Sequence, residues 1–193
     1  MSMKKAVMAV LIGAAVVAGG VFVNASAALA LDNFGLPAQN GGVFNIASPL
    51  GDYGNECMDI RGASGAEHAV AQTYACSTGW NQQFYLLRSG TINSYPVWRI
   101  EARFTHDNTP VANWKCLTVA SVGVGIENDT CSSTWAQLFV LQNTTGSDYF
   151  YEYMIRPVYD MDCLQLSGTA DLAPLRQAGC LATDPHDVWM LAH

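Results

Sequence analysis

Short runs in which apolar and polar residues alternate recur along the chain from residue 42 onward. The segments 57–60 (Cys-Met-Asp-Ile), 97–104 and 151–156 alternate in this way and contain many Val, Ile, Trp and Tyr residues. Alternation with a period of two is typical of strands that bury one face. Turn-forming residues such as Ser89-Gly90 interrupt the runs, and no convincing helical period accompanies them. The pattern therefore predicts an all-β domain.

The first thirty residues follow a different pattern. Two lysines at 4–5 precede an unbroken apolar and glycine segment, 6–23, and small residues crowd 25–30. This order is typical of a signal peptide over residues 1–30, cleaved after Ala30, with Ala27 as an alternative cleavage position. An uncleaved membrane anchor is the competing interpretation. We expect an exported protein, secreted or periplasmic, in which residues 31–41 form an extended N-terminal segment before the domain at 42–193.

This domain repeats one pattern three times, over approximately 42–95, 96–145 and 146–193. Each copy begins with Cys-apolar-polar-apolar, continues to a second cysteine, and ends with polar-x-aromatic-x-Leu. The aromatic residue follows the second cysteine by 8, 8 and 9 residues. The three aromatic residues are Phe84, Phe139 and Trp189. Such agreement predicts one structural unit built three times.

The six cysteines divide evenly among the copies, and an exported protein meets an oxidising compartment in which disulfides persist. The simplest pairing keeps each disulfide within one copy, although six cysteines allow about fifteen pairings. A zinc site is the weaker alternative, because no close Cys pair or Cys/His cluster occurs. The predicted disulfides are Cys57–Cys76, Cys116–Cys131 and Cys163–Cys180.

Composition restricts the partners. Hydrophobic residues make up 50% of the chain and charged residues 13%, which argues against disorder. The net charge is −7, with only 9 Lys and Arg residues. Such a chain neutralises few phosphates, so we expect neither nucleic acid nor an anionic membrane surface as a partner. No second apolar stretch is long enough to span a bilayer, so we expect no membrane insertion of the mature chain.

Three disulfide loops, each followed by a Gln-x-aromatic motif or its variant, resemble the ricin B-type lectin family. The resemblance covers approximately residues 42–191. It implies a β-trefoil, in which three four-stranded units surround a pseudo-threefold axis and the motif's aromatic residues share one core. This chain departs from the family's Gln-x-Trp pattern by placing Phe in two copies and Asp187 in place of the third Gln.

The resemblance also implies a sugar site in each unit, for galactose or N-acetylgalactosamine. Such a site needs a carboxylate to accept from hydroxyls, an aromatic platform, and an amide that both donates and accepts. The first copy fills every position: Asp59 as acceptor, Tyr74 as platform, Asn81 as donor, and Gln72 and Gln82 as support. In this interpretation Gln82 is also a possible brace for Asp59.

The second and third copies lack this set. Thr118, Asp129 and Ala136 occupy the acid, aromatic and Asn positions of the second copy. Gln165, Ala178 and His186 occupy those of the third. We interpret both as structural copies. Trp80 and Trp135 share one offset in two copies, which favours a structural role for both.

No catalytic motif, cofactor motif or metal-ligand spacing is present, and the four histidines are interpreted as surface residues. The sequence therefore predicts a non-enzymatic lectin that binds galactose-type glycans. One alternative is the cell-binding subunit of a multi-chain toxin, such as a cytolethal distending toxin, with other toxin subunits as partners; a homo-oligomer is also open. The third is a trefoil scaffold or inhibitor that binds no sugar.

Overall fold

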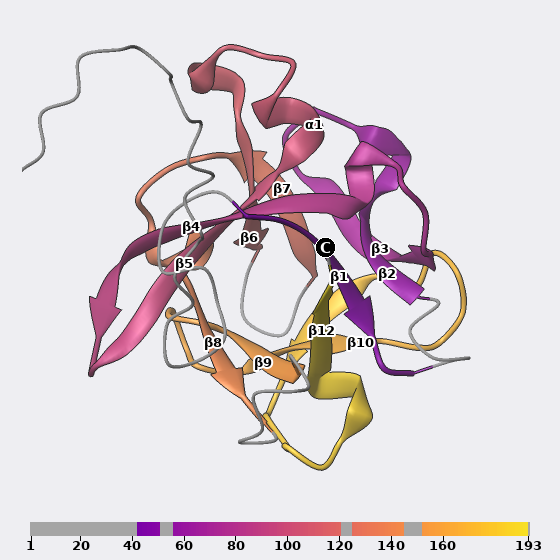
Figure 1. Ribbon diagram of the computed structural model, residues 1–193, viewed down its shortest axis with the longest axis vertical. Coiled ribbons are helices and arrows are strands. Elements are labelled where there is room, and N and C mark those ends of the chain that lie inside the picture. Colours follow the sequence, from indigo (N-terminus) through magenta and orange to yellow (C-terminus); the bar gives the residue numbers. More distant parts are fainter. Residues whose placement is uncertain (1–41, 51–55, 121–124, 145–151, 193) are drawn as a thin grey trace, which may run out of the picture.

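The computed structural model describes residues 42–50, 56–120, 125–144 and 152–192. The predicted signal peptide and the segment 31–41 lie outside the described residues. Within the described part, twelve strands form three successive units of four (Figure 1). Unit one contains β1 (Gly42–Ser48), β2 (Glu56–Ile60), β3 (Ala69–Ala75) and β4 (Gln83–Ile92). Unit two contains β5 (Tyr95–Ala102), β6 (Lys115–Val119), β7 (Ile126–Thr130) and β8 (Phe139–Asn143). Unit three contains β9 (Glu152–Pro157), β10 (Cys163–Leu166), β11 (Leu175–Ala178) and β12 (Val188–Ala192).

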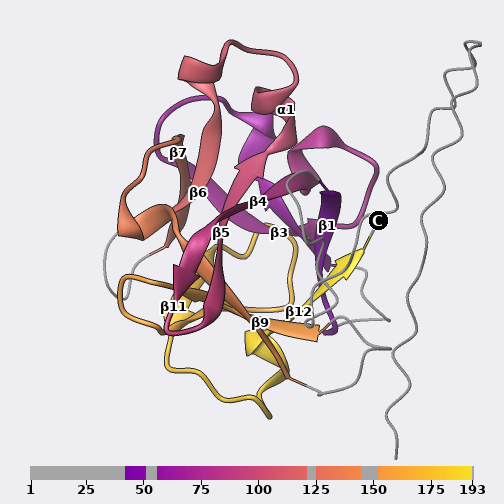
Figure 2. The same cartoon turned by 60° about the vertical axis from the view of Figure 1, so that its left-hand side comes forward.

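The first and last strands of the three units form a closed barrel (Figure 2). β1 pairs with β4, β4 with β5, β5 with β8 and β8 with β9. β9 then pairs with β12, and β12 pairs with β1, which completes the ring. All these pairings are antiparallel, and closure leaves the six barrel strands without a free edge.

The two middle strands of each unit form hairpins, β2–β3, β6–β7 and β10–β11. Neighbouring hairpins also contact one another. β3 pairs with β7 through Ala69 and Asn128, and Gln72 forms a bridge to Pro174 beside β11. A residue on one hairpin can therefore lie close to the turn of another.

The three motif aromatics lie at the centre of the structure. Phe84, Phe139 and Trp189 are completely buried in one hydrophobic cluster. Burial of each such side chain stabilises the fold by about 1.5–3 kcal/mol. The Trp189 indole N–H donates to the Leu164 carbonyl at 3.0 Å, so the polar group of this larger ring also has a hydrogen-bond partner. The predicted shared aromatic core is confirmed.

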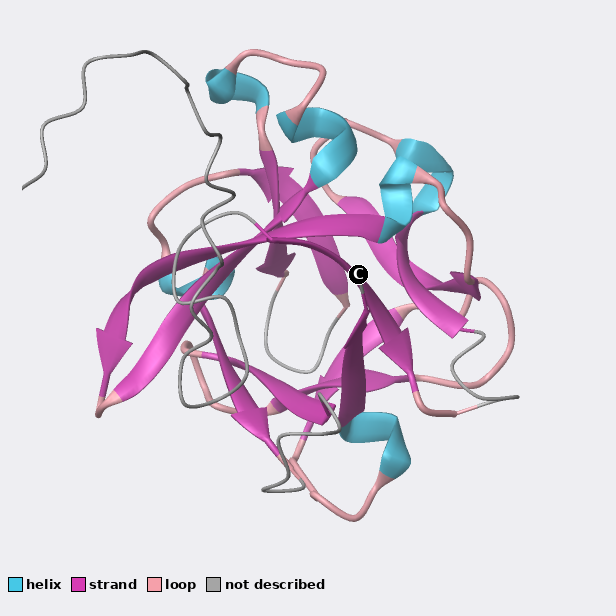
Figure 3. Ribbon diagram, viewed as in Figure 1, coloured by secondary structure: helices cyan, strands magenta, loops and turns pink. Residues whose placement is uncertain are grey.

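Short helical turns connect the strands (Figure 3). The 3-10 turns η2 (Trp80–Gln82), η4 (Trp135–Gln137) and η5 (Pro185–Asp187) each precede the last strand of a unit. Two more, η1 (Arg61–Ala63) and η3 (Val111–Asn113), follow β2 and precede β6.

The strand predicted over 97–104 ends two residues early. β5 stops at Ala102 because α1 (Arg103–His106) forms a single helical turn. In this turn the Asp107 N–H donates to the Arg103 carbonyl at 2.9 Å, and the Arg103 guanidinium donates to the Asp107 carboxylate at 2.9 Å. One turn is too short to produce a helical period in the sequence.

All three predicted disulfides are confirmed, one in each unit. Cys57–Cys76, Cys116–Cys131 and Cys163–Cys180 have Cα–Cα distances of 4.9, 5.0 and 5.0 Å. Each links the first strand of a hairpin to the residues after its second strand. Closing loops of this length stabilises the fold by about 3 kcal/mol apiece in the chain-entropy model.

Candidate functional site

A buried polar side chain ties the hairpin of each unit to the 3-10 turn before its last strand. Gln82 donates to the carbonyl before Cys76 at 3.0 Å and accepts from the N–H after it at 2.6 Å. Gln137 makes the same two contacts on either side of Cys131, at 3.0 and 2.6 Å. The motif glutamine is therefore part of the architecture in both units.

The same amide also reaches the residue two positions after the first cysteine. In unit one Gln82 Nε2 donates to Asp59 Oδ2 at 3.3 Å. In unit two Gln137 Nε2 donates to Thr118 Oγ1 at 2.9 Å. In units one and two, the residue at this position therefore accepts a hydrogen bond from the motif glutamine, which we call the brace.

Unit three exchanges the two partners. Gln165 now stands at the acid position and donates to Asp187 Oδ1 at 3.0 Å. Asp187 Oδ2 accepts from the N–H of Leu181, the residue after Cys180, at 2.7 Å. The substitution of Asp187 for the motif glutamine therefore preserves the brace. Burial raises the pKa of Asp187, partly offset by these hydrogen bonds.

Unit one carries a pocket of about 220 Å³ that opens to solvent. It brings together all five residues that the sequence pointed to, although they come from β2, β3 and η2. The lining residues are Asp59, Arg61, Gly62, Gln72, Tyr74, Ser77, Asn81, Gln82 and Leu172.

Asp59 forms the base of this pocket and is only 3% exposed. Its Oδ1 accepts from Gln72 Nε2 at 3.1 Å, and its Oδ2 accepts from the amides of Asn81 and Gln82. A carboxylate offers about four acceptor positions, so one remains for a ligand hydroxyl. Burial raises the pKa of Asp59, and the hydrogen bonds from Gln72 and Gln82 partly offset this effect.

Asn81 is oriented by the Asp59 carboxylate. One hydrogen of its Nδ2 donates to Asp59, and the other remains for a ligand hydroxyl. The carbonyl Oδ1 lies close to Gly79, where an added Cβ would approach it to 2.7 Å. Gly79 has φ −62, so its backbone tolerates any residue, and it is the space for Asn81 that calls for glycine.

Tyr74 lies at the rim of the pocket and is 43% exposed. Strand periodicity explains its place, because Gln72 and Tyr74 are two residues apart on β3 and share a face. The register sets Asp59 opposite Gln72 and Cys57 opposite Tyr74. An exposed ring beside a buried carboxylate offers one small ligand both an apolar face and a hydrogen-bond acceptor.

Four lining residues, Arg61, Gly62, Ser77 and Leu172, were missed by the sequence analysis. Arg61 follows Asp59 by two residues, and that spacing could have suggested a shared face. Leu172 comes from the β10–β11 connection of unit three, and its carbonyl lies 111 residues from Arg61 along the chain. No local signal in the sequence points to Leu172.

The segment that carries Leu172 is held on β3 by several contacts. The Leu172 N–H donates to the Thr73 carbonyl at 2.8 Å, and the Thr73 N–H donates to the Ala173 carbonyl at 2.9 Å. Asp171 accepts from the Ala75 N–H at 3.0 Å. Leu172 itself has φ 67, a conformation that is costly for a leucine. Unit three thus supplies one wall of the pocket in unit one.

Unit two receives a similar segment from unit one, but with different chemistry. The Thr130 N–H donates to Glu67 at 2.9 Å, and His68, at φ 61, corresponds to Leu172. The His68 ring lies 2.8 Å from Glu127 and 3.2 Å from Asp129. The hydrogen bond with Glu127 and the charge of Asp129 raise the pKa of His68.

These three side chains come close enough to hold a metal ion, which linear spacing had not suggested. Each is already engaged with another in the group. Asp129 stands where Tyr74 stands in unit one, so this position of β7 offers a carboxylate in place of an aromatic ring. Cys116 and Cys131 also approach Glu101, but both are in a disulfide and offer no thiolate.

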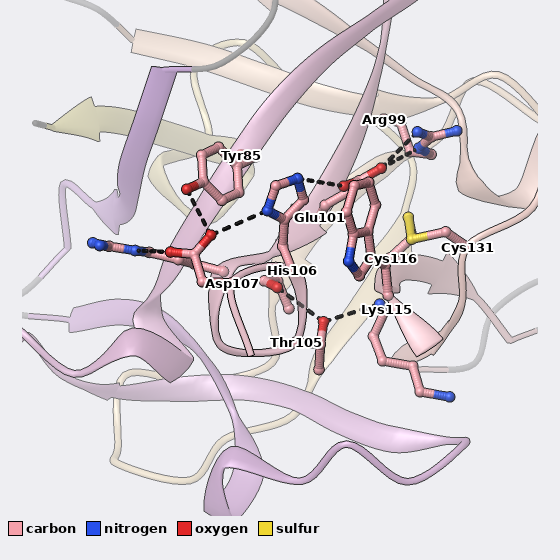
Figure 4. Close-up of polar contacts among 12 residues, drawn as sticks. Tyr85, Arg99, Glu101, Thr105, His106, Asp107, Lys115, Cys116 and Cys131 are labelled. Atoms are coloured by element: carbon pink, nitrogen blue, oxygen red, sulfur yellow. Dashed lines mark hydrogen bonds and ion pairs between the residues drawn. A yellow bond between two sulfur atoms is a disulfide. The ribbon is translucent and has the colours of Figure 1, made fainter. Parts of the chain in front are cut away.

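A second polar cluster surrounds α1 (Figure 4). Glu101 is completely buried; its Oε1 lies 2.6 Å from an Arg99 nitrogen and its Oε2 3.8 Å from His106 Nε2. The His106 ring lies between Tyr85 and Trp114, with centroid distances of 4.3 and 3.9 Å. His106 is therefore partly buried in the cluster, not a surface residue as expected.

This cluster supports the turn beside the pocket. Asp107 accepts from Tyr85 at 2.9 Å and binds Arg103, whose guanidinium carbon lies 4.7 Å from the Trp80 ring centre. Burial favours a higher pKa for Asp107, but the hydrogen bonds from Arg103 and His106 lower it on balance. Trp80 begins η2, the turn that carries Asn81.

The structural role expected for the two tryptophans is only partly correct. Trp80 is 44% exposed and Trp135 62% exposed, so neither belongs to the core. Trp80 carries the Arg103 guanidinium on its ring. Their shared offset reflects the shared turn, which places the residue two positions before the brace glutamine at the surface in both units.

Comparison with solved structures identifies the architecture. ThreeFoil, a designed threefold-symmetric protein, aligns with a TM-score of 0.65 and 19% identity over 79% of this chain and 99% of that one. The Macrolepiota procera ricin B-like lectin in complex with lactose aligns at 0.60 and 14%, over 80% and 97%. The chain has the β-trefoil fold of the ricin B-like lectins.

The fold also occurs among toxins. The Haemophilus ducreyi cytolethal distending toxin aligns at 0.55 and 17% identity, over 77% of this chain and 83% of that one. No family model and no curated protein sequence matches the chain. In the described residues, no helix has the length and hydropathy to span a membrane. The three disulfides are consistent with an extracellular protein.

Proposed function

We propose that the protein is a non-enzymatic lectin that binds galactose-type glycans through the unit-one pocket. The observation that carries this proposal is the convergence of a braced carboxylate, three amides and an exposed tyrosine around one opening. Asp59 accepts from a sugar hydroxyl, and Tyr74 contacts the apolar face of the ring. Asn81, with Gln72 and Gln82 behind it, completes the polar side of the pocket.

A shallow polar site of this kind binds a single sugar weakly. Ligand hydroxyls replace well-bound water, so the expected dissociation constant is on the order of millimolar, or about −4 kcal/mol. Clustered glycans or a homo-oligomer would raise the effective affinity through multivalency.

Isothermal titration with lactose tests the proposal. Asp59→Asn removes the charge while keeping the shape, and we expect it to abolish measurable binding. Tyr74→Ala should weaken binding strongly. Thr118→Ala and Gln165→Ala, the matched changes in units two and three, should leave lactose affinity unchanged. Binding that survives Asp59→Asn, or that disappears with Gln165→Ala, would contradict a single site in unit one.

A second candidate function is that of a cell-binding subunit in a multi-chain toxin. The observation in its favour is the structural likeness to the cytolethal distending toxin. Purification of the protein from its source under native conditions distinguishes the two roles. A stoichiometric catalytic chain, identified by mass spectrometry, would support the toxin assembly, and an isolated chain that binds glycan would support the lectin alone.

Export is the remaining part of the proposal. The sequence of residues 1–30 and the three disulfides support secretion through a cleavable signal peptide. N-terminal sequencing of the secreted protein should begin at Leu31. An intact Met1 in the mature protein would favour the uncleaved anchor.

A further inference from the structure

Arg61 is a cation at the edge of the unit-one pocket. It begins η1 directly after β2, lines the pocket and is exposed. Its Nε donates to Gln72 Oε1 at 2.6 Å, and Gln72 Nε2 donates in turn to Asp59 at 3.1 Å. These contacts connect the guanidinium through Gln72 to the carboxylate at the base of the pocket.

The Nη1 and Nη2 nitrogens, which form the outer edge of this guanidinium, make few hydrogen bonds. Nη2 makes one long contact, 3.5 Å, with the Leu172 carbonyl, and Nη1 has no partner among the described residues. No ion pair in the described part of the chain involves Arg61, whereas Arg99 and Arg103 each pair with a carboxylate. Arg156 and Arg176 also lack an ion pair among the described residues, but each donates from an Nη nitrogen to a nearby oxygen at 2.8 Å or less.

We propose that the ligand of this pocket is a galactose-type glycan with an acidic substituent, a carboxylate or a sulfate, bound by Arg61. The inference rests on the proposed function. The planar Nη1–Nη2 edge of a guanidinium matches the two oxygens of such a group, and charge-assisted bonds of this type are strong. Asp59 at the base accepts from a neutral hydroxyl while Arg61 at the rim binds the anion, so the two charges act on different parts of the ligand.

The alternative is that Arg61 only positions Gln72. Arg176 of unit three provides the comparison, because its Nε and Nη2 donate to Gln165 Oε1 at 2.9 and 2.6 Å. Arg176 is exposed as well, but it stands beside Ala178, where unit one has Tyr74. A purely positioning arginine affects all ligands of the pocket alike, whereas an anion-binding arginine changes the ratio between acidic and neutral ligands.

The test is titration of the purified protein with lactose, 3′-sialyllactose and galactose 6-sulfate at low and high salt. We expect at least one acidic ligand to bind up to about fivefold more tightly than lactose at low salt, the range of a solvent-exposed ion pair. This preference should shrink at high salt. The two acidic ligands distinguish a carboxylate from a sulfate.

Arg61→Gln should remove the preference, and Arg61→Lys should retain part of it. Arg176→Gln is the control and should leave the ratio unchanged. Because the ratio is measured within each variant, a general loss of affinity through Gln72 does not affect it. Equal affinities for all three ligands in the unmodified protein, or a preference that survives Arg61→Gln, would overturn the inference. If lactose binding also survives Asp59→Asn, or is absent altogether, the proposed function itself is wrong.

Discussion

Units one and two share a framework but differ at their surfaces. Both contain the disulfide, the hairpin and the glutamine brace, Gln82 in one and Gln137 in the other. Unit one places a carboxylate under the brace and a tyrosine beside it, whereas unit two places Thr118 and Asp129 there. The comparison teaches that the brace belongs to the fold, whereas the residues around the brace decide which side chains a ligand would meet.

The neighbouring segments reinforce this contrast. Unit one receives the apolar Leu172 from unit three, which leaves Tyr74 accessible at 43% exposure. Unit two receives His68, which engages both Glu127 and Asp129. The same backbone arrangement thus leaves a pocket open in one unit and fills the corresponding polar surface in the other with internal hydrogen bonds.

The largest expected effect separates framework from site. Replacing Cys116 and Cys131 together with alanine should lower the free energy of unfolding by about 3 kcal/mol, because a 15-residue loop is no longer closed. Lactose affinity should be nearly unchanged, since the proposed site is in unit one. The same change at Cys57 and Cys76 should cost similar stability and also weaken lactose binding. Urea unfolding measures the stability and titration measures the lactose affinity. Equal loss of lactose binding in both variants would contradict a site confined to unit one.

The next effect distinguishes the two brace acceptors. Asp59→Ala leaves the amides of Gln72, Asn81 and Gln82 without their shared acceptor, which should cost about 1–3 kcal/mol as well as abolish lactose binding. Thr118→Ala removes one acceptor from Gln137, which keeps its backbone partner, and should cost about 1 kcal/mol or less. Chemical denaturation would contradict this order if Thr118→Ala were the more destabilising change.

A smaller effect concerns the glycine that makes room for Asn81. Gly79→Ala places a methyl group 2.7 Å from Asn81 Oδ1 and 3.1 Å from Ser77 Oγ. We expect lactose affinity to fall roughly two- to tenfold, the value of one displaced hydrogen bond. The corresponding residue of unit two is Thr134, where no Asn follows, and Thr134→Ala should have no effect on binding. Unchanged affinity in Gly79→Ala would show that Asn81 adapts without loss.

The smallest effects are those of pH on stability. They have opposite signs for Asp59 in the unit-one pocket and for Glu67 on the segment that contacts unit two. The pKa of Asp59 is raised above 3.8. In the proposed function lactose binding needs the carboxylate, so binding should decline at a higher pH than an ordinary aspartate would predict. The protonated form favours folding, so this contribution to stability is complete below 3.8 and is lost as the pH rises through the raised pKa.

Glu67 behaves in the opposite way. The hydrogen bonds from Lys115 and Thr130 lower its pKa to about 2, so its contribution to stability is present above 4.5 and is lost as the pH falls toward about 2. Because Glu67 is half exposed, Glu67→Gln should cost about 1 kcal/mol or less at pH 7. Denaturation curves of both proteins from pH 7 to pH 2 should converge on acidification, and a constant difference would refute this assignment.

The sequence determined the framework because the relevant distances are local. A period of two places Asp59 opposite Gln72 and sets Gln72 and Tyr74 on one face, and fixed offsets from the cysteines carry this arrangement into each hairpin. The threefold repetition then distinguished the shared core aromatics, Phe84, Phe139 and Trp189, from the residues found in one copy alone.

Tertiary structure decided which residues surround the candidate site. Leu172 reaches the pocket because the hairpin segment of unit three docks on β3, and His68 reaches β7 in the same way. Side-chain direction could not be predicted from the sequence either, since Asn81 donates to Asp59 and His106 lies between two rings. Contacts between units depend on how three twisted hairpins pack around an axis, and residue spacing within one unit does not determine that packing.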